Sequence, residues 1–417
     1  MRFVPAHLDI AATAIRAVLP LEYPADAILR RFFRENPTLG SNDRAFVAEA
    51  VFGILRHRFF LEQIVNLATP RSLLLAYLIK FQGINLRELT ACISRTEEKW
   101  LAEIKAITLE SQSLAIQAEF PEWLMEKLTH FMPDTDILDL GHSLQQPAPL
   151  DLRVNTLLTK RNEVLEALTQ EGIQAQITPY SPSGIRIVGR PAINRHPLFQ
   201  SGKIEVQDEG SQLLGYLLAP KRGEMVVDFC AGSGGKALLL GMLMNSKGRV
   251  YAFDVSEKRL HNLKPRLKRS TLSNLHPQLI SHENDIKVKR LAGKIDRVLV
   301  DAPCSGLGTL RRNPDLKWRQ SPKSIEEIKK KQMAILAAAG NLLKPGGRLV
   351  YATCSFLPEE NQEIIESFLI QYPKFTLLNC TDLLSQQNIP LDTGELLQLS
   401  PALHHTDGFF AAAMTFT

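Results

Sequence analysis

The sequence predicts an α/β protein in which residues 213–417 form a doubly wound parallel sheet with helices on both faces. Three observations support this prediction. The chain has 417 residues, too many for one ordinary core. Apolar residues recur with helical spacing alone through residues 1–142, and short apolar strands alternate with helices from Glu224 onward. Between these regions, residues 143–212 show a strand–helix–strand–turn–strand pattern. We therefore expect three domains, at 1–142, 143–212 and 213–417.

The composition is that of an ordinary globular protein, with 45% hydrophobic and 22% charged residues. No apolar run approaches the length of a membrane span, and Asp9 and Arg16 interrupt the N-terminal apolar region where a signal peptide would be continuous. The five cysteines include no CxxC pair, which favours a reducing compartment over a disulfide framework or a zinc ribbon. We expect a cytoplasmic protein with no bound metal and no membrane partner.

Basic residues are concentrated in one part of the chain. Residues 251–350 contain 21 Lys and Arg against 9 Asp and Glu, whereas residues 351–417 contain one Lys against eight acids. A basic band on one domain is typical of contacts with nucleic-acid phosphates, and a solvated helix face is the alternative. Because this band flanks the candidate site described below, we favour nucleic acid.

Residues 1–142 are predicted to be helical throughout. The apolar positions between Leu8 and Leu19 fall on one helix face, and Ser41, Asn42 or Asp43 can cap a helix that runs to Leu55. No chemical constellation occurs here, so a helical bundle for docking or RNA contact is expected.

Secondary structure in the rest of the chain follows from periodicity. The small domain has a helix at 161–170 and its last strand at 185–187, and a further helix lies within 207–220. Strands of the large sheet are predicted at 225–229, 249–254, 278–281, 295–300, 348–353, 375–378 and 408–416. Its helices are predicted from 237 and at 256–269, 325–342 and 359–371, with a turn at 344–347. Repeated βα units of this kind indicate a parallel sheet.

The central stretch runs from Ile295 to Trp318, IDRVLVDAPCSGLGTLRRNPDLKW. An apolar strand ends at Asp301 and Cys304, and ligands bind at the carboxyl ends of such strands. The stretch closes on basic and aromatic residues suited to a polyanion, which are Arg311, Arg312, Lys317, Trp318 and Arg319. We interpret it as the floor of a site for a nucleic-acid base.

A glycine-rich turn between a strand and a helix indicates a cofactor site. It comprises Cys230, Ala231, Gly232, Ser233, Gly234, Gly235 and Lys236. Asp254 ends the next strand, where a carboxylate can accept hydrogen bonds from a ribose, and Asp285 is a candidate partner for an adenine amino group. The turn and Asp254 fit either a dinucleotide or the adenosyl cofactor of methyl transfer, and a purely structural turn is the alternative.

Two cysteines each follow a strand of the sheet and precede a serine, Cys304 after VLVDAP and Cys354 after LVYAT. Carbon-5 of a pyrimidine is a poor nucleophile. Addition of a thiolate to carbon-6 makes carbon-5 reactive toward a sulfonium methyl group, and a base must then remove the carbon-5 proton. Two thiols and Asp301 match that demand, although these residues alone leave open which thiol attacks.

Several long motifs now resemble the Nol/Nop/Sun family of RNA cytosine-5 methyltransferases. They are DFCAGSGGK, VDAPCSGLGTLRRNPDLKW and YATCSFLPEEN, supported by LRVNTLLT, EVQDEGSQL and HHTDGFFAA. DRAFVAEAVFGILRH is similar to the NusB-like helical domain of the bacterial Sun/Fmu (RsmB) branch, which modifies small-subunit (16S) ribosomal RNA. The resemblance implies a Rossmann-like class I methyltransferase domain, preceded by a NusB-like helical domain and a small RRM- or ferredoxin-like domain.

The resemblance also implies roles for individual residues. Cys354 would be the nucleophile, Cys304 would help release the product, and Asp301 would contact cytosine near the cofactor. S-adenosylmethionine would be held by the turn from Cys230 to Lys236 together with Asp254, Asp285 and Asp301, with Lys236 reaching toward the catalytic loop. One departure stands out, because the family commonly has Ala-Ala-Pro-Gly-Gly-Lys-Thr where this chain has Ala-Gly-Ser-Gly-Gly-Lys-Ala.

From these observations we expect a monomer that methylates cytosine carbon-5 in 16S ribosomal RNA, with S-adenosylmethionine as cofactor. The same chemistry on transfer RNA or large-subunit RNA is one alternative. A non-catalytic RNA-binding assembly factor is the other, and the altered glycine turn is its only support.

Overall fold

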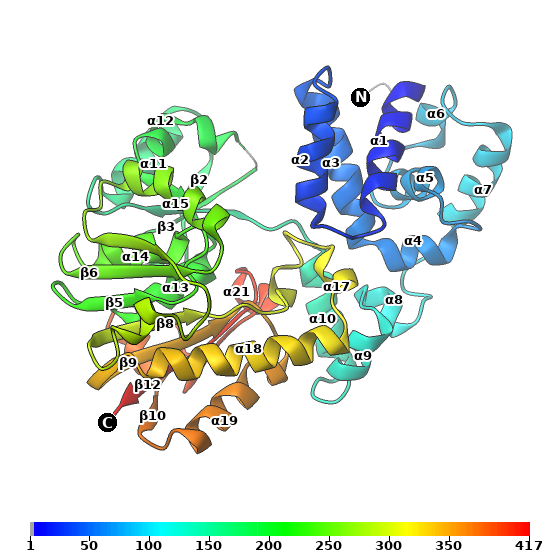
Figure 1. Ribbon diagram of the computed structural model, residues 1–417. Helices are drawn as coiled ribbons and strands as arrows, with labels where there is room; N and C mark the ends of the chain where they lie inside the picture. Colours follow the sequence, from blue (N-terminus) through cyan, green and yellow to red (C-terminus); the bar gives the residue numbers. More distant parts are fainter. Residues whose placement is uncertain (1–3, 190) are drawn as a thin grey trace. The chain divides into compact units, whose positions relative to one another are not determined.

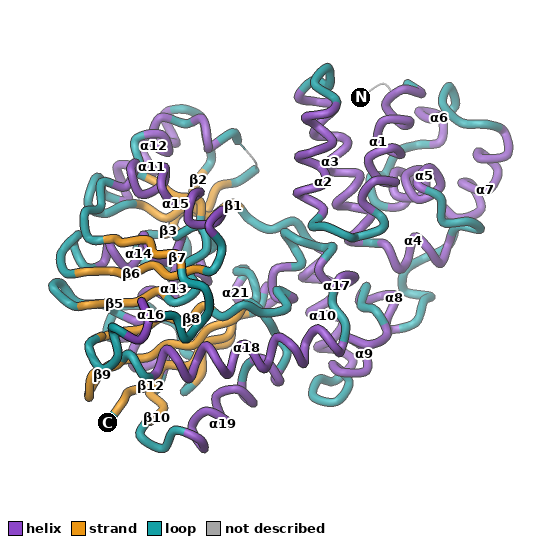
Figure 2. Tube along the Cα trace, viewed as in Figure 1, coloured by secondary structure: helices purple, strands orange, loops and turns teal. Residues whose placement is uncertain are grey.

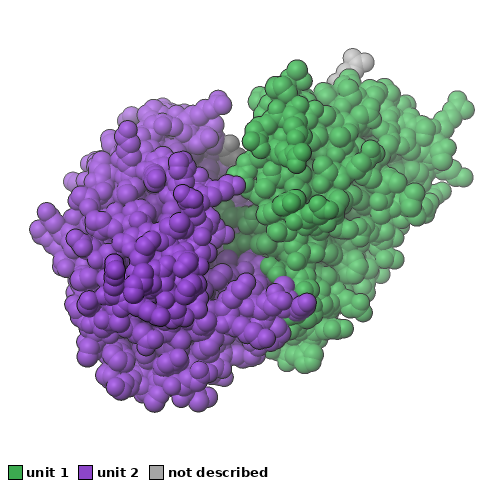
Figure 3. Space-filling view, in the orientation of Figure 1, with its two compact units in different colours: residues 1–147, 309–322 green, residues 148–308, 323–417 purple. Residues whose placement is uncertain are grey.

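A computed structural model describes residues 4–189 and 191–417. The chain forms two compact units, coloured separately in Figure 3. The helical unit comprises the described residues up to Pro147 together with Thr309–Pro322, and the catalytic-fold unit comprises Ala148–Gly308 and Lys323–Thr417. The division into three domains expected from the sequence stays a prediction.

The helical unit confirms that the first part of the chain is built from helices. Its central helix α5 (Pro70–Lys80) buries every residue from Leu73 to Ile79, so it has no polar face. It contacts α1 (Pro5–Val18), α3 (Ser41–Arg56), α4 (Arg58–Ile64) and α7 (Arg95–Lys105). The other helices of this unit are α2 (Ala25–Glu35), α6 (Leu86–Leu89), α8 (Leu114–Ala118), α9 (Glu122–Leu128), α10 (Asp134–Gln145) and α17 (Leu316–Arg319).

The N-terminus of α3 differs in detail from the prediction. Gly40 is the N-cap residue rather than Ser41, Asn42 or Asp43. The Asp43 carboxylate still supports this terminus, because it accepts a hydrogen bond from the Gly40 amide at 3.0 Å.

A small antiparallel sheet begins the second unit, in the order β2-β3-β1-β4. Its strands are β1 (Leu150–Val154), β2 (Ala175–Ile177), β3 (Gly184–Ile187) and β4 (Ile204–Val206), of which β4 was not predicted. Helix α11 (Arg161–Gln170) covers one face through Val164 and Leu168. The short helices η1 (Ile193–Arg195) and α12 (Pro197–Gln200) precede β4.

The large sheet confirms the doubly wound α/β fold. Its order is β10-β12-β9-β8-β5-β6-β7, with β11 paired to β12. The parallel strands are β5 (Met225–Asp228), β6 (Arg249–Asp254), β7 (Leu275–Leu279), β8 (Ile295–Asp301) and β9 (Leu343–Thr353). The late strands β10 (Phe375–Leu378), β11 (Leu396–Leu399) and β12 (Phe409–Phe416) join antiparallel.

Helices cover both faces of this sheet (Figures 1 and 2). One face packs against α13 (Glu209–Leu218), α14 (Gly235–Leu243), α15 (Glu257–Ser270) and α20 (Cys380–Ser385). The other packs against α18 (Pro322–Gly340) and α19 (Gln362–Gln371). The short elements are α16 (Ile286–Lys289), η2 (Leu307–Thr309), η3 (Pro358–Glu360) and α21 (Pro401–His404). In the part of the chain that the structure describes, no helix is long and apolar enough to cross a membrane.

Three predicted elements were displaced. The predicted turn at 344–347 belongs to β9, where Gly346 adopts a φ of 77° and the pairing with β8 shifts register between Ile295 and Arg297. The strand predicted at 278–281 lies at Leu275–Leu279, because Pro277 within it does not break the strand. The helix predicted at 325–342 begins and ends earlier, at Pro322 and Gly340.

Candidate active site

A cavity of about 920 Å³ lies at the carboxyl ends of the parallel strands. Loops after β5, β6, β8 and β9 contribute to it, and α18 closes one side. This is the edge where open α/β sheets bind ligands. The lining residues are Phe229, Cys230, Ala231, Gly232, Ser233, Asp254, Val255, Arg259, Ile280, Ser281, His282, Glu283, Asp301, Ala302, Pro303, Cys304, Lys330, Lys331, Ala334, Ile335 and Cys354.

The glycine-rich turn supplies the floor of the cavity beside β5. Gly232 and Gly234 have φ angles of 57° and 82°, in the left-handed region that glycine adopts without strain. A Cβ atom at Gly234 would lie 2.0 Å from Leu263 Cδ1, so the turn can pack against α15 only with glycine there. Cys230, Ala231, Gly232 and Ser233 line the cavity, whereas Gly234 and Gly235 do not.

Asp254 holds the turn in place from the end of β6. Its carboxylate accepts hydrogen bonds from the Gly232 amide at 2.8 Å and from the Ser256 amide at 2.7 Å, and it lines the cavity. Asp285 instead caps α16 and accepts from the Ser281 amide at 2.9 Å. Hydrogen bonds from the backbone amides of Lys287 and Ser281 lower the pKa of Asp285 to about 2. Asp285 is outside the lining, but it fixes Ser281, which belongs to it.

An ion pair joins the glycine turn to the loop after β8. Lys236 Nζ lies 2.7 Å from Asp301 Oδ2. Burial is the largest single influence and would lower the pKa of Lys236, but the charge and hydrogen bond of Asp301, together with the charges of Cys354 and Asp228, outweigh it and raise the pKa above its ordinary value. Lys236 therefore remains a cation inside the site, and the charge of Cys354 contributes to this shift.

The two predicted cysteines meet in the cavity. Cys304 Sγ and Cys354 Sγ are 3.3 Å apart, and the Cys354 amide donates to Cys304 Sγ at 3.4 Å. Their hydrogen bond, followed by burial and by the charges of Cys354 and Glu360, raises the pKa of the Cys304 thiol well above its ordinary value. Cys304 therefore keeps its proton at neutral pH. The structure thus brings together Lys236, Asp301 and both cysteines, which lie far apart in the sequence.

Comparison with known proteins identifies the family. The model described as 16S rRNA methyltransferase RsmB/F matches residues 215–415, and the RsmF/B ferredoxin-like domain matches residues 120–194. The ribosomal RNA small subunit methyltransferase B of Yersinia pseudotuberculosis is 32% identical over 422 residues, covering 92% of this chain and 94% of that protein. The chain belongs to the RsmB/F family of 16S rRNA methyltransferases.

Two further comparisons agree with this assignment. A probable small subunit methyltransferase B of Synechocystis is 37% identical over 307 residues, covering 73% of this chain and 68% of its own length. The crystal structure of the protein designated PH0851 matches with a TM-score of 0.81 and 27% identity, covering 100% of this chain and 99% of that one. The predicted resemblance and fold are confirmed, and this chain is an rRNA methyltransferase.

Two buried carboxylates of this RsmB/F methyltransferase were missed in the sequence. Asp228 ends β5 and is fully buried; burial, then the charge of Asp301, raises its pKa to about 7. Glu360 is also fully buried and contacts the serines that follow both cysteines. An acid that closes an apolar strand could have revealed Asp228. Nothing local distinguishes Glu360 from Glu359, because its burial depends on long-range packing.

The prediction of a polyanion-binding tail is wrong for two of its residues. Arg311 and Lys317 are 6% and 3% exposed, which leaves neither side chain open to phosphate. Lys317 Nζ donates to the Arg56 carbonyl at 3.0 Å, and the Trp318 indole donates to the Leu55 carbonyl at 3.0 Å. These side chains anchor the segment Thr309–Pro322 in the helical unit.

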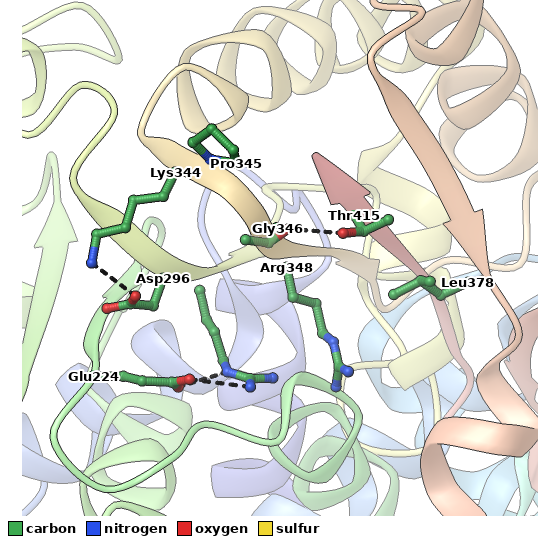
Figure 4. Close-up of a pocket in the computed structure, with 10 residues that line it drawn as sticks. Glu224, Asp296, Lys344, Pro345, Gly346, Arg348, Leu378 and Thr415 are labelled. Carbon is green, nitrogen blue, oxygen red and sulfur yellow. Dashed lines mark hydrogen bonds and ion pairs between the residues drawn. The ribbon is translucent and has the colours of Figure 1, made fainter. Parts of the chain in front are cut away.

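A second cavity, of about 290 Å³, lies near the amino end of β9 (Figure 4). Its charged groups are largely paired: Arg297 with Glu224 at 2.6 Å and Lys344 with Asp296 at 2.8 Å. Arg348 donates to the Leu217 and Leu218 carbonyls that end α13. These contacts explain the cavity as part of the scaffold. Among the described residues, no group of three or more His, Cys, Asp or Glu could hold a metal ion.

Proposed function

We propose that this protein methylates carbon-5 of a cytosine in 16S ribosomal RNA, with S-adenosylmethionine as methyl donor and a covalent adduct on Cys354. The observation that carries this proposal is the pair of thiols 3.3 Å apart beside the Lys236–Asp301 ion pair. Nucleophilic addition to a pyrimidine ring requires a thiolate, and its release requires a base. Membership of an rRNA methyltransferase family supports RNA as the substrate.

The residues of the cavity fit the proposed cofactor. Gly232 exposes backbone at the floor, Asp254 lies at the end of the second parallel strand, and the exposed Val255 side chain offers an apolar surface beside it. The volume of about 920 Å³ is ample for a nucleoside-sized ligand. Ser281, held by Asp285, would border the adenine. When bound, S-adenosylmethionine supplies an electrophilic methyl group on a sulfonium sulfur.

The chain's own residues would act on the cytosine in sequence. The Cys354 thiolate adds to carbon-6 and makes carbon-5 nucleophilic. Asp301 would hydrogen-bond to the pyrimidine as charge moves onto the ring. After the methyl group has been accepted, a base removes the carbon-5 proton. The bond between carbon-6 and the Cys354 sulfur then breaks, and Cys354 returns to the thiolate form.

Cys304 is suited to the role of that base once the adduct has formed. The hydrogen bond with Cys354 is the first cause of its raised pKa. When the Cys354 sulfur is bonded to carbon this contact is weakened, so the Cys304 proton can pass to water. The Cys304 thiolate then accepts the carbon-5 proton, and the cycle releases one proton overall.

The cytosine must leave its helix or lie in an unpaired loop to reach these thiols. Exposed cations that line the cavity, Arg259 on α15 and Lys330 and Lys331 on α18, are available for the flanking phosphates. They replace Arg311 and Lys317 as the expected RNA contacts.

Trapping tests the proposed roles of the two cysteines. A Cys304→Ala variant should accumulate an RNA adduct that survives denaturing electrophoresis, whereas Cys354→Ala should form none. The reverse pattern would overturn the assignment. Bisulfite sequencing of ribosomal and transfer RNA from a deletion strain then identifies the substrate. The proposed function would be refuted if the deletion strain lost no 5-methylcytosine from 16S RNA. It would also be refuted if calorimetry detected no binding of S-adenosylmethionine.

A further inference from the structure

Glu360 connects the two loops that carry the cysteines. Its carboxylate accepts the Ser305 backbone amide on Oε1 at 2.8 Å and the Ser305 hydroxyl on Oε2 at 2.5 Å. The Ser355 hydroxyl also donates to Oε2, and the two hydroxyl oxygens are 3.0 Å apart. Ser305 follows Cys304 and Ser355 follows Cys354, so one carboxylate is hydrogen-bonded to the residue that follows each cysteine.

Glu360 is itself fixed from two other elements, one of which contacts its carboxylate and the other its backbone. The Gln332 amide of α18 donates to Glu360 Oε1 at 3.1 Å and to the Pro303 carbonyl at 3.1 Å. The Tyr351 hydroxyl of β9 donates to the Glu360 carbonyl oxygen at 2.7 Å. Glu360, Ser305 and Gln332 are 0% exposed. A buried carboxylate with four donors is held rigidly.

We propose that Glu360 is a positioning residue that holds the two cysteine loops in register and keeps the resting proton of the thiol pair on Cys304. This inference rests on the proposed two-cysteine mechanism. Sulfurs that drift apart lose the contact through which one thiol senses the other. A fixed negative charge that acts on Cys304 and a Lys236 cation that interacts with Cys354 give the two thiols different tasks.

The charges around Cys304 support this division. Cys354 and Glu360 both raise the pKa of Cys304, and the pKa of the buried Tyr351 phenol is raised by burial and then by Cys304 and Glu360. The charge of Lys236 is paired with that of Asp301. On α18, Lys330 and Lys331 lie on the cavity lining and are exposed to solvent, which screens them. Glu360 is therefore the fixed buried anion that acts on Cys304.

Two variants distinguish the hydrogen bonds that join the two cysteine loops from the negative charge of Glu360. Glu360→Gln keeps an acceptor for the Ser305 and Gln332 N–H groups, and its amide can donate to the serine hydroxyls, but the charge is lost. Ser355→Ala leaves the Glu360 carboxylate in place and removes the hydroxyl through which it is hydrogen-bonded to the Cys354 loop. Glu363→Gln is the matched control, because its carboxylate is 54% exposed and pairs with Lys329 at 3.4 Å, away from both serines.

The first measurement needs no RNA. Alkylation of Cys304 by iodoacetamide is followed against pH by peptide mass spectrometry on the full-length protein. Glu360→Gln should raise the Cys304 rate at pH 8 about tenfold, because loss of the neighbouring negative charge increases the fraction of Cys304 present as thiolate. Ser355→Ala and Glu363→Gln should leave the Cys304 rate within a factor of two. An unchanged rate in Glu360→Gln would overturn the inference, even if the enzyme methylates cytosine as proposed.

The second measurement is methylation of 16S RNA. Both Glu360→Gln and Ser355→Ala should lower kcat at least tenfold while KM for S-adenosylmethionine stays within a factor of two, since neither contacts the cofactor cavity. If Glu360→Gln does not fold, a normal kcat in Ser355→Ala overturns the inference by itself. If the wild-type protein methylates no cytosine but the thiol profile shifts as expected, the proposed function fails and the electrostatic part of the inference stands.

Discussion

Removal of the Glu119 side chain should destabilise the helical unit more than any surface substitution. Glu119 is fully buried, and its carboxylate accepts the Phe59 amide at 2.9 Å and the Phe60 amide at 3.0 Å, which begin α4. Lys317 Nζ lies 3.9 Å away, from the segment Thr309–Pro322. Burial raises the pKa of Glu119 and lowers that of Lys317, so the pair exists at a desolvation cost that its contacts must offset.

The expected loss for Glu119→Ala follows from these contacts. Two buried N–H groups lose a carboxylate acceptor, at about 1–3 kcal/mol each. The ammonium of Lys317 loses its counter-ion, but it keeps the Arg56 carbonyl at 3.0 Å and can shed its proton, which limits the added cost. We therefore expect a loss of about 4 kcal/mol in the free energy of unfolding. Glu119→Gln retains one acceptor and should cost about half as much.

Urea unfolding followed by tryptophan fluorescence measures this loss selectively. The three tryptophans, Trp100, Trp123 and Trp318, all belong to the helical unit. The control is Glu122→Ala on the exposed surface of α9, which should change stability by less than about 0.5 kcal/mol. If Glu119→Ala costs no more than this control, the buried pair does not anchor the segment and the reasoning is wrong.

Three further predictions concern the catalytic-fold unit. Asp228 has a pKa of about 7 in the folded protein against 3.8 for the free group, so between these pH values the folded state binds more protons than the unfolded state. The free energy of unfolding should therefore fall as pH rises from 4 to 7.5. Asp228→Asn should remove roughly 4 kcal/mol of this decline, as measured by urea titrations at each pH. Gly234→Ala should lose about 3 kcal/mol through the 2.0 Å clash with Leu263, against about 1 kcal/mol for Gly232→Ala, where a Cβ meets nothing within 4 Å. Lys331→Ala should weaken RNA binding at low salt and lower the slope of log K against log salt by about 0.7, and an unchanged slope would exclude a phosphate contact.

Residue types at the predicted strand ends were sufficient to predict which residues would lie in much of the candidate site. The spacing of Asp301, Cys304 and Cys354 at strand ends predicted a shared cavity, because parallel strands bring their carboxyl ends to one edge. The same reasoning misjudged Lys317, which is charged and follows a glycine-rich loop. Its burial depends on the Arg56 carbonyl, 261 positions earlier in the chain. No local pattern contains that partner, so composition favoured solvent and phosphate.

The long motif from Asp301 to Trp318 therefore combines two physical tasks that its sequence does not separate. Residues up to Gly308 belong to the catalytic-fold unit, where Asp301 and Cys304 line the cavity. Residues from Thr309 belong to the helical unit, where Trp318 donates to the Leu55 carbonyl. The anchored segment therefore directly follows, in the chain, the loop that carries Cys304. The loop that carries Cys354 does not adjoin this segment in sequence. Glu360 is hydrogen-bonded to both cysteine loops, so it opposes any independent movement of Cys304. A weakened anchor should therefore displace Cys304 more in Ser355→Ala than in the wild type.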